Sequence, residues 1–303
     1  MIIELLTGAV RGGTSIMYAG LGETISERAG VINLGTEGSM LVGALGGYAL
    51  TAQSGSPWVG VIGGALAGAL LSLIHAVLVV SRQANQFASG LTLYFFALGV
   101  TALYGVSYVS RQVNAFTSMP IPGLSEIPVI GPVLFDHDPL VYLGFVAAPV
   151  IWWVLFRTRI GLIVRSAGER SDALEVHGYS VTRVRYLSIT IGGALAGIGG
   201  AHISIAYANS WFEGMIAGRG FIAVALVIFA MWNPLTIMGG AYLFGAALSL
   251  ASVLQASGFA VNQFALNAVP FVLTLIVLAV LGKRTLQAAP DELLKVLENT
   301  RTA

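Results

Sequence analysis

Two polar stretches of the sequence carry most of the side chains that could do chemistry. The first covers residues 22–38, where glycines allow the backbone to leave helical geometry. If this stretch lies in a membrane, as the composition described below indicates, a broken helix is tolerated where it lines a cavity, so Asn33 and Glu37 are candidates for contact with a polar solute. The alternative is a solvated loop in which Glu27 and Arg28 are surface charges.

The second stretch, residues 157–185, is rich in charged residues. Its arginines are Arg157, Arg159, Arg165, Arg170, Arg183 and Arg185. The pattern at residues 169–177 predicts one short helix, with acids near its start and Gly178 in the position of a C-terminal cap. Its small apolar side consists of Ala173, Leu174 and Val176. Such a helix could enter a groove on a partner protein, or it could rest on lipid headgroups.

Other kinds of chemistry find no support in the sequence. Neither Lys283 nor Lys295 ends a phosphate-binding loop, so the chain cannot hydrolyse ATP by that route. Protease motifs are missing, the four histidines are far apart in sequence, and there is no cysteine. No cofactor is therefore expected on this chain, and any process that ATP drives would have to take its energy from another subunit.

The composition indicates a protein dissolved in lipid. Of its 303 residues, 56% are hydrophobic and only 10% are charged, whereas a soluble domain has about 25% charged residues. Residues 220–282 contain no Asp, Glu, Lys or Arg. These features exclude a soluble enzyme. The scattered basic residues form no stripe for phosphate backbones, so nucleic-acid binding is not expected.

Apolar segments long enough for membrane helices predict the fold. Nine segments lie near residues 3–22, 34–53, 57–80, 88–109, 139–157, 184–206, 218–231, 234–256 and 264–282. They are apolar on all sides, which argues against a β-barrel. We therefore predict an all-α integral membrane protein with about nine transmembrane helices (eight to ten). The charges in the first segment and the short length of the seventh argue against a full membrane crossing by these two segments.

The positions of Lys and Arg predict the orientation. The arginine-rich loop 157–185 is expected in the cytoplasm, and the loop 110–138, whose one basic residue is Arg111, outside. Counting onwards places Lys283 and Arg284 inside with the C-terminus, and nine passes place the N-terminus outside.

Small residues at four-residue spacing predict close helix packing. They occur at Gly43/Gly47, at Gly60/Gly64/Gly68 and at Gly193/Gly197.

Taken together, these motifs resemble a known family of transport proteins. The first reads Glu27-Arg28-x-Gly30-Val-Ile-Asn33-Leu-Gly35-x-Glu37-Gly38, and the second pairs the 157–185 loop with small residues from Gly192 to Ala201. A third match runs from Gly218 to Pro234. The chain is similar to the permease subunits of bacterial ABC importers for ribose-type sugars, nucleosides and branched-chain amino acids. It looks most like the shorter permease of nucleoside uptake systems.

The resemblance implies a single permease domain over residues 1–303. Within it, residues 158–183 would form a cytoplasmic coupling loop with a coupling helix, and residues 284–303 a cytoplasmic tail. The residues expected to couple to the ATPase are Gly168, Glu169, Arg170, Asp172, Ala173, Leu174, Gly178 and Tyr179.

The resemblance also implies partners and a place in the cell. The chain would pair with a second, different permease in the bacterial inner membrane, on a double-cassette ATPase that uses the ATP. An extracytoplasmic solute-binding lipoprotein would deliver a small polar solute to the outer loops, where Trp211, Phe212 and Glu213 are candidate contacts. An aromatic belt at the membrane interface explains Trp211 and Phe212 at least as well. The candidate pathway residues are Asn33, Glu37, Asn85, Gln86 and Asn233. Each could instead cap a helix or bond two helices together.

Four alternatives remain at this stage. Within the family, the solute could be a simple sugar or a branched-chain amino acid. Outside it, an ion-driven carrier would need ionisable groups in the later helices, which residues 220–282 lack. A purely structural membrane partner would need no polar path at all.

Overall fold

The computed structural model describes residues 1–257, 266, 268–270, 272–276, 279 and 289–299. Within these residues the chain is helical and contains no β-strand. The principal helices are α1 Ile2–Arg28, α2 Thr36–Ser54, α3 Pro57–Ala76, α4 Gln86–Gly105, α6 Pro139–Arg157, α9 Val181–His202, α10 Arg219–Phe229 and α11 Pro234–Ala256. The short helices are α5 Ile130–Leu134, α7 Arg159–Glu169, α8 Ser171–Val176 and α14 Asp291–Asn299.

Five of the described helices are long and apolar enough to cross a membrane. They are Pro57–Ser81, Gln86–Tyr108, Pro139–Arg157, Val181–Tyr207 and Pro234–Ala256, two of which include a final π-helical turn. Large apolar side chains such as Leu66, Phe95 and Trp153 are exposed on these helices, as expected for surfaces that face lipid. The chain is a multi-pass membrane protein.

Most of the predicted segments correspond to observed helices. The fifth and eighth have the same bounds as α6 and α11, and the second, third, fourth and sixth differ by a few residues. The first prediction was too short, because α1 continues to Arg28. The ninth segment, 264–282, falls largely outside the described residues, so the number of nine passes stays a prediction.

The seventh segment is shorter than a membrane span. Helix α10 has 11 residues, which corresponds to about 16 Å of the roughly 30 Å bilayer core. The segment before it, residues 208–218, is not helical, yet its Trp211, Met215 and Ile216 are buried. Irregular backbone at membrane depth is tolerated only inside protein or beside a water-filled cavity. Helix α10 is therefore a half-helix within the bundle.

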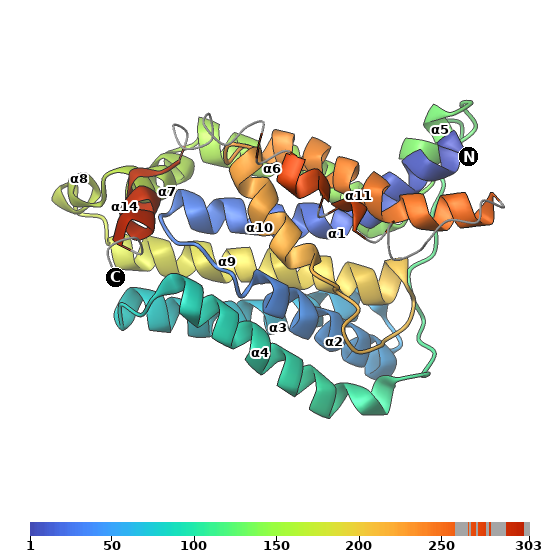
Figure 1. The fold of residues 1–303 in the computed structure, drawn as a ribbon, viewed down its shortest axis with the longest axis horizontal. Coiled ribbons are helices and arrows are strands. Elements are labelled where there is room, and N and C mark those ends of the chain that lie inside the picture. The colour runs from blue at the N-terminus through green and yellow to red at the C-terminus, as the bar shows by residue number, and fades with distance from the viewer. Residues whose placement is uncertain (258–265, 267, 271, 277–278, 280–288, 300–303) are drawn as a thin grey trace.

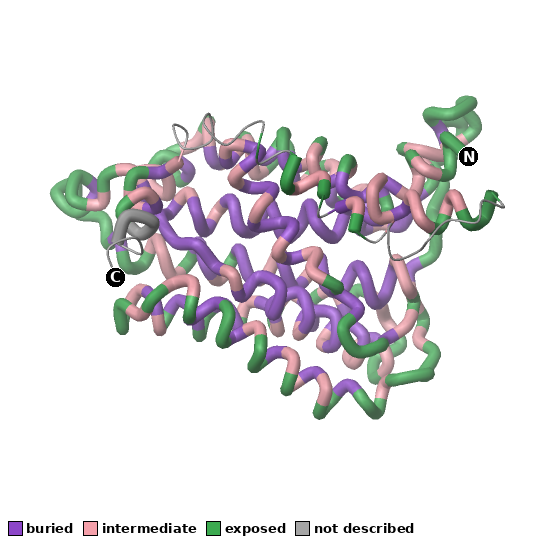
Figure 2. The backbone as a smooth tube through the Cα atoms, in the orientation of Figure 1, coloured by how far each residue is buried: buried purple, intermediate pink, exposed green. Residues whose placement is uncertain are grey.

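Helices α1 and α9 lie in the middle of the bundle, with α6 and α11 on one side and α2, α3 and α4 on the other (Figure 1). Buried residues concentrate along these central helices (Figure 2). The predicted small-residue contacts are confirmed. A Cβ atom on Gly197 of α9 would lie 2.1 Å from the carbonyl oxygen of Gly64 on α3, so only glycine permits this approach.

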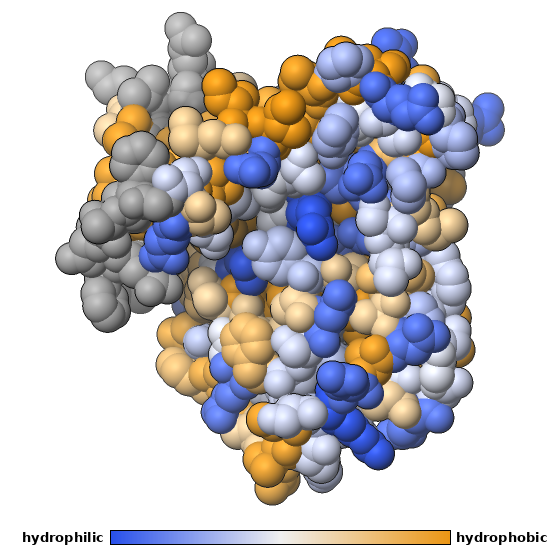
Figure 3. Space-filling view, turned by 90° about the vertical axis from the view of Figure 1, so that its right-hand side faces the viewer, coloured by the Kyte–Doolittle hydropathy of each residue, from blue (hydrophilic) through white to orange (hydrophobic). Residues whose placement is uncertain are grey.

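The two ends of the bundle differ in character. Helices α7, α8 and α14 gather at one end, and the N-terminus and α5 lie at the opposite end (Figure 1). Viewed from that opposite end, the molecule shows hydrophilic residues around a hollow near its centre (Figure 3). The orientation predicted from the arginines assigns the α8 end to the cytoplasm.

Candidate functional site

The irregular segment between α1 and α2, residues 29–35, is held by polar contacts inside the bundle. The carboxylate of Glu23 accepts a 2.7 Å hydrogen bond from the backbone N–H of Asn33 and a 2.8 Å bond from the Thr36 hydroxyl. The Asn33 amide donates to Ser72 of α3 at 3.3 Å. Only 2% of Glu23 and 1% of Glu27 is exposed, so the alternative of a solvated loop is wrong.

Glu37, in the first turn of α2, joins that helix to the half-helix α10. Its two carboxylate oxygens accept hydrogen bonds from the backbone N–H groups of Gly218, at 2.8 Å, and Gly220, at 2.6 Å. The first N–H groups of a helix lack intrahelical partners and carry partial positive charge, which makes a buried carboxylate a suitable partner. The starts of α2 and α10, each of which follows an irregular part of the chain, are thus linked through one side chain.

The other end of α10 contacts the end of α1. The Trp232 indole N–H donates to the carboxylate of Glu27. The guanidinium of Arg28 donates to the carbonyl oxygens of Met231, at 3.3 Å, and Trp232, at 3.4 Å. Both Met231 and Trp232 have positive φ angles, 52° and 55°, which turn the chain sharply between α10 and α11. Contacts to α1 therefore fix this turn.

The remaining pathway candidates lie at helix starts. Asn85 caps α4 by accepting from the N–H of Ala88 at 3.0 Å, and Asn233 caps α11 by accepting from Leu235 at 3.0 Å. Gln86 accepts a 2.8 Å hydrogen bond from the N–H of Ile32. The structure thus brings Gln86 beside the Asn33 segment, whereas Asn85 and Asn233 act as helix caps. Their contact with a solute stays a prediction.

The predicted single helix over residues 169–177 is wrong in its boundaries. Glu169 ends α7, and Arg170, with φ −146° and ψ 80°, breaks the helix before α8 begins at Ser171. The sequence pattern hid this break because Arg170 itself is a good helix former. The predicted terminal glycine is confirmed: Gly178, with φ +81°, follows the last turn of α8.

Helix α8 presents less apolar surface to its own chain than its sequence suggests. Leu174 is buried against Ala167 and Val181, while Ala173 is exposed and Val176 is 86% exposed. Only one of the three apolar residues faces the protein. A helix of six residues makes fewer than two turns, so one face of it offers little room for a second buried residue.

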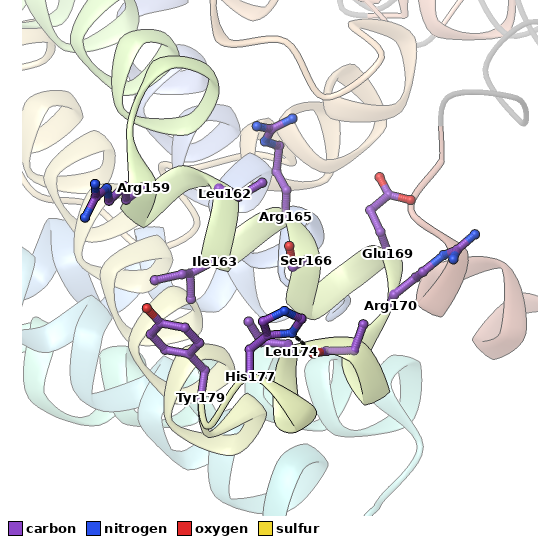
Figure 4. Close-up of a pocket in the computed structure, with 11 residues that line it drawn as sticks. Arg159, Leu162, Ile163, Arg165, Ser166, Glu169, Arg170, Leu174, His177 and Tyr179 are labelled. Atoms are coloured by element: carbon purple, nitrogen blue, oxygen red, sulfur yellow. Dashed lines mark hydrogen bonds between the residues drawn. The ribbon is translucent and has the colours of Figure 1, made fainter.

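Helices α7 and α8 line a groove of about 670 Å³ that is open to solvent (Figure 4). Its lining residues are Arg159, Leu162, Ile163, Arg165, Ser166, Glu169, Arg170, Ala173, Leu174, His177 and Tyr179. Five of the predicted coupling residues belong to this set, namely Glu169, Arg170, Ala173, Leu174 and Tyr179. Asp172 and Gly178 lie on the same short helix and the turn after it, both exposed.

The groove is attached to the transmembrane helices at two points. Gly168 packs so closely on the end of α1 that a Cβ atom there would lie 2.4 Å from the carbonyl oxygen of Arg28. The guanidinium of Arg28 also lies 3.7 Å from the carboxylate of Glu169. On the other side, Arg185 of α9 donates to the carbonyl oxygens of Ala29 and Ala167, both at 3.2 Å. A displacement of α7 would therefore reach α1 and α9 directly.

Sequence reasoning missed several of these residues. Arg185 counted only as one of the loop's basic residues, and Glu292, its partner at 3.0 Å, carried no motif at all. Conversely, Trp211 was expected at an outer surface but is 3% exposed and packs against Gly105 of α4. Phe212 and Glu213 are exposed, as that expectation requires.

The polar groups inside the bundle are engaged with one another and with helix ends. Within the part of the chain that the structure describes, no three His, Asp or Glu side chains gather so as to hold a metal ion. The buried carboxylates accept hydrogen bonds from the chain's own N–H and hydroxyl groups. What the geometry provides is a set of helix ends tied to a groove at one face of a membrane-spanning bundle.

A multi-pass helical bundle with broken helices and buried polar groups is compatible with passage of a polar solute through a membrane. The chain belongs to the family described as "Branched-chain amino acid transport system / permease component", whose model matches residues 5–281. This match confirms the resemblance drawn from the motifs.

Individual relatives are similar over most of their length. The putative glucose ABC transporter permease protein TsgC13 of Haloferax volcanii is 44% identical over 245 residues, which are 80% of this chain and 74% of that protein. The nucleoside ABC transporter permease protein NupC of Lactococcus lactis is 39% identical over 285 residues, 89% and 90% of the two chains. The guanosine ABC transporter permease protein NupQ of Bacillus subtilis is 35% identical over 278 residues, 87% of each.

Proposed function

We propose that this chain is the transmembrane subunit of an ABC importer that carries a nucleoside or nucleobase into the cytoplasm. The observation that carries the proposal is similarity to two nucleoside-type permeases, NupC and NupQ, over nearly nine-tenths of both chains. A sugar is the second candidate, because the glucose-type relative has higher identity over a shorter stretch. The branched-chain amino acids of the family's description are a third.

The proposal includes partners that supply what this chain lacks. An ATPase, with two cassettes in one chain, would bind at the α7–α8 groove and use the ATP, while this chain binds no cofactor. A second, different permease would complete the pathway, since the chain resembles the shorter of two permeases. A solute-binding lipoprotein would dock on the opposite face, whose centre is hydrophilic and hollowed (Figure 3). The assembly would lie in the bacterial inner membrane.

The contacts at the α8 end support a mechanism for coupling. The exposed Val176 at the tip of α8 would insert into the ATPase, in the manner of a helix in a groove. Closure of the cassettes on ATP would move α8 and α7 as one unit. Arg28 would pass this movement to α1 and to the turn after α10, because Gly168 of α7 packs against its carbonyl oxygen and its guanidinium contacts the carbonyl oxygens of Met231 and Trp232.

Within this proposal, the pathway candidates divide into two groups. Asn33 and Glu37 would shape the pathway indirectly, by holding residues 29–35 and the start of α10 in place. Gln86, Asn85 and Asn233 are less buried and could contact the solute directly. Both groups would respond to movement of α1, because each lies beside one of its ends or the segment that follows it.

Uptake by the reconstituted complex tests the proposal. Proteoliposomes would contain this chain with its ATPase, second permease and binding protein, and would be given labelled uridine, guanosine, ribose, glucose or leucine. We expect ATP-dependent uptake of a nucleoside and little uptake of the other solutes. A variant, Val176→Asp, tests the role of α8 in the same assay. It places a charge at the exposed end of α8 without touching a buried contact, and it should abolish ATP-dependent uptake.

Other outcomes would redirect the assignment. Glucose or ribose uptake without nucleoside uptake would favour the sugar alternative, and leucine uptake the amino-acid one. Uptake by this chain alone, driven by an ion gradient and insensitive to ATP, would contradict the importer proposal and favour a secondary carrier.

A further inference from the structure

The C-terminal helix α14 contacts the coupling region through one carboxylate. Glu292 accepts hydrogen bonds from the Ser171 hydroxyl at 3.2 Å, from Arg185 at 3.0 Å and from Lys295 at 2.8 Å. Ser171 is the first residue of α8, and Arg185 belongs to α9. A single side chain therefore joins the start of the predicted coupling helix to a transmembrane helix.

Apolar burial holds α14 in this position. Leu293, next to Glu292, is 1% exposed and belongs to the main hydrophobic core, and Pro290 before the helix is buried as well. A helix of nine residues is too short to be stable by itself in water, so its order depends on these contacts. The position of Glu292 is therefore fixed from two directions, by a buried leucine and by charged partners.

Glu292 also lies against the irregular segment after α1. A Cβ atom on Gly30, whose φ is +89°, would lie 3.0 Å from the Cβ atom of Glu292. Arg185 completes the arrangement, because the same guanidinium that binds Glu292 donates to the carbonyl oxygens of Ala29 and Ala167. The ends of α1 and α7, the start of α8 and the body of α9 thus meet around this pair.

We propose that Glu292 is a positioning residue for energy coupling: it fastens the start of α8 to α9 and to the end of α1. This inference rests on the proposed function. The contact of Glu169 with Arg28 is half exposed, and exposed ion pairs hold little free energy. Glu292 and Arg185 are both mostly buried, so their charged hydrogen bonds are stronger. The fastening makes α8 move with the transmembrane helices rather than slide over them.

The test uses the complete complex in proteoliposomes with Glu292→Gln. The carboxamide is nearly the same size but carries no charge for Arg185. We expect uptake per ATP hydrolysed to fall about tenfold, while basal ATPase activity stays within about twofold. Hydrogen exchange at the amides of residues 171–176 should speed up in the same variant. The matched control is Asp291→Asn, which removes an exposed charge from the same helix and should change neither measurement.

A cross-link distinguishes a fastening from a fold defect. Because the chain has no cysteine, Ser171→Cys with Glu292→Cys introduces a unique thiol pair. The complex with this double variant should transport poorly while both thiols are reduced. It should recover most of its uptake per ATP when a short bismethanethiosulfonate joins the two thiols. Recovery would not occur if the substitutions had merely damaged the fold.

Three results would overturn the proposal. The first is normal uptake per ATP in Glu292→Gln, and the second is unchanged exchange at residues 171–176. The third is a cross-link that blocks transport, which would mean that α14 must release α8. If even the unmodified complex shows no ATP-dependent uptake, the proposed function fails, and hydrogen exchange alone then decides whether Glu292 fastens α8.

Discussion

The carboxylate of Glu37, in the first turn of α2, accepts a 2.6 Å hydrogen bond from the backbone N–H of Gly220, in the first turn of α10. The contact joins residues far apart in the sequence. It satisfies a helix start that lies inside the bundle, where water is not at hand to do so. A residue first noticed as a candidate for solute binding is thus engaged by the protein itself.

Replacing Glu37 should therefore lower stability. Glu37→Ala leaves the N–H groups of Gly218 and Gly220 without acceptors, at a cost of about 1–3 kcal/mol each. Glu37→Gln should cost less, because its carbonyl oxygen still accepts one bond. The apparent melting temperature of detergent-solubilised protein, followed by fluorescence-detected size exclusion, measures both, with the exposed Glu213→Ala as the control. Unchanged melting with altered solute affinity would instead make Glu37 a direct solute contact.

The close contact between α3 and α9 should not tolerate a side chain. In Gly197→Val the new Cβ atom would lie 2.1 Å from the carbonyl oxygen of Gly64, and the backbones would have to separate. We expect destabilisation of about 3 kcal/mol or more, measured as loss of the monodisperse peak. Gly99→Val is the matched control, since beyond its chain neighbours and its own helix backbone no atom lies within 4 Å of a Cβ built on Gly99. Equal behaviour of the two variants would contradict the packing described.

The two members of the Arg28–Glu169 pair should differ in importance. Arg28 is mostly buried and also holds the turn after α10, whereas Glu169 is 44% exposed. Glu169→Gln should change uptake per ATP by less than about threefold, because exposed ion pairs contribute about 0–1 kcal/mol. Arg28→Ala should lower it about tenfold or more with ATPase activity retained. The reverse order would mean that Glu169 contacts the ATPase itself.

The attachment of α14 should weaken in acid. Burial raises the pKa of the Glu292 carboxyl, but the hydrogen bonds from Lys295 and Arg185 outweigh burial and hold the pKa below its ordinary value. A carboxyl with a lowered pKa in the folded state stabilises it at neutral pH, and that stabilisation is lost as the pH falls below about 4.

Pulsed EPR measures this effect with spin labels at Thr182→Cys and Asp291→Cys. The distance distribution should be narrow at pH 7 and broad below pH 4, and Glu292→Gln should make it broad at both. A distribution that stays narrow in acid would show that Leu293 alone holds the helix.

The sequence predicted the membrane helices well because hydrophobicity is a local property. Residues 139–157 and 234–256 are apolar runs bounded by proline and polar residues, and their ends needed no knowledge of neighbours. It failed at α1, where Glu23 and Glu27 suggested a loop. Both glutamates belong to helix α1, because this helix is surrounded by other helices and their carboxylates find hydrogen-bond partners there.

The candidate site was predicted in its outline and missed in its connections. The arginine-rich loop and Gly178 marked a short helix at one face of the bundle. The break at Arg170, the burial of Leu174 alone and the meeting of Arg185 with Glu292 depend on residues that are distant in sequence. No local pattern encodes such contacts.

By itself, the sequence determined that this chain dissolves in lipid as helices, that nearly a third of its charges lie in one loop, and that its motifs are those of a transport permease. Only the tertiary structure decided that α10 is a half-helix with its start on Glu37, and that α14 returns to the start of α8. The physical reason is that hydrophobicity and charge are properties of the residues along the chain, whatever their neighbours in space. Hydrogen bonds between helix ends, by contrast, exist only once those ends have been brought together.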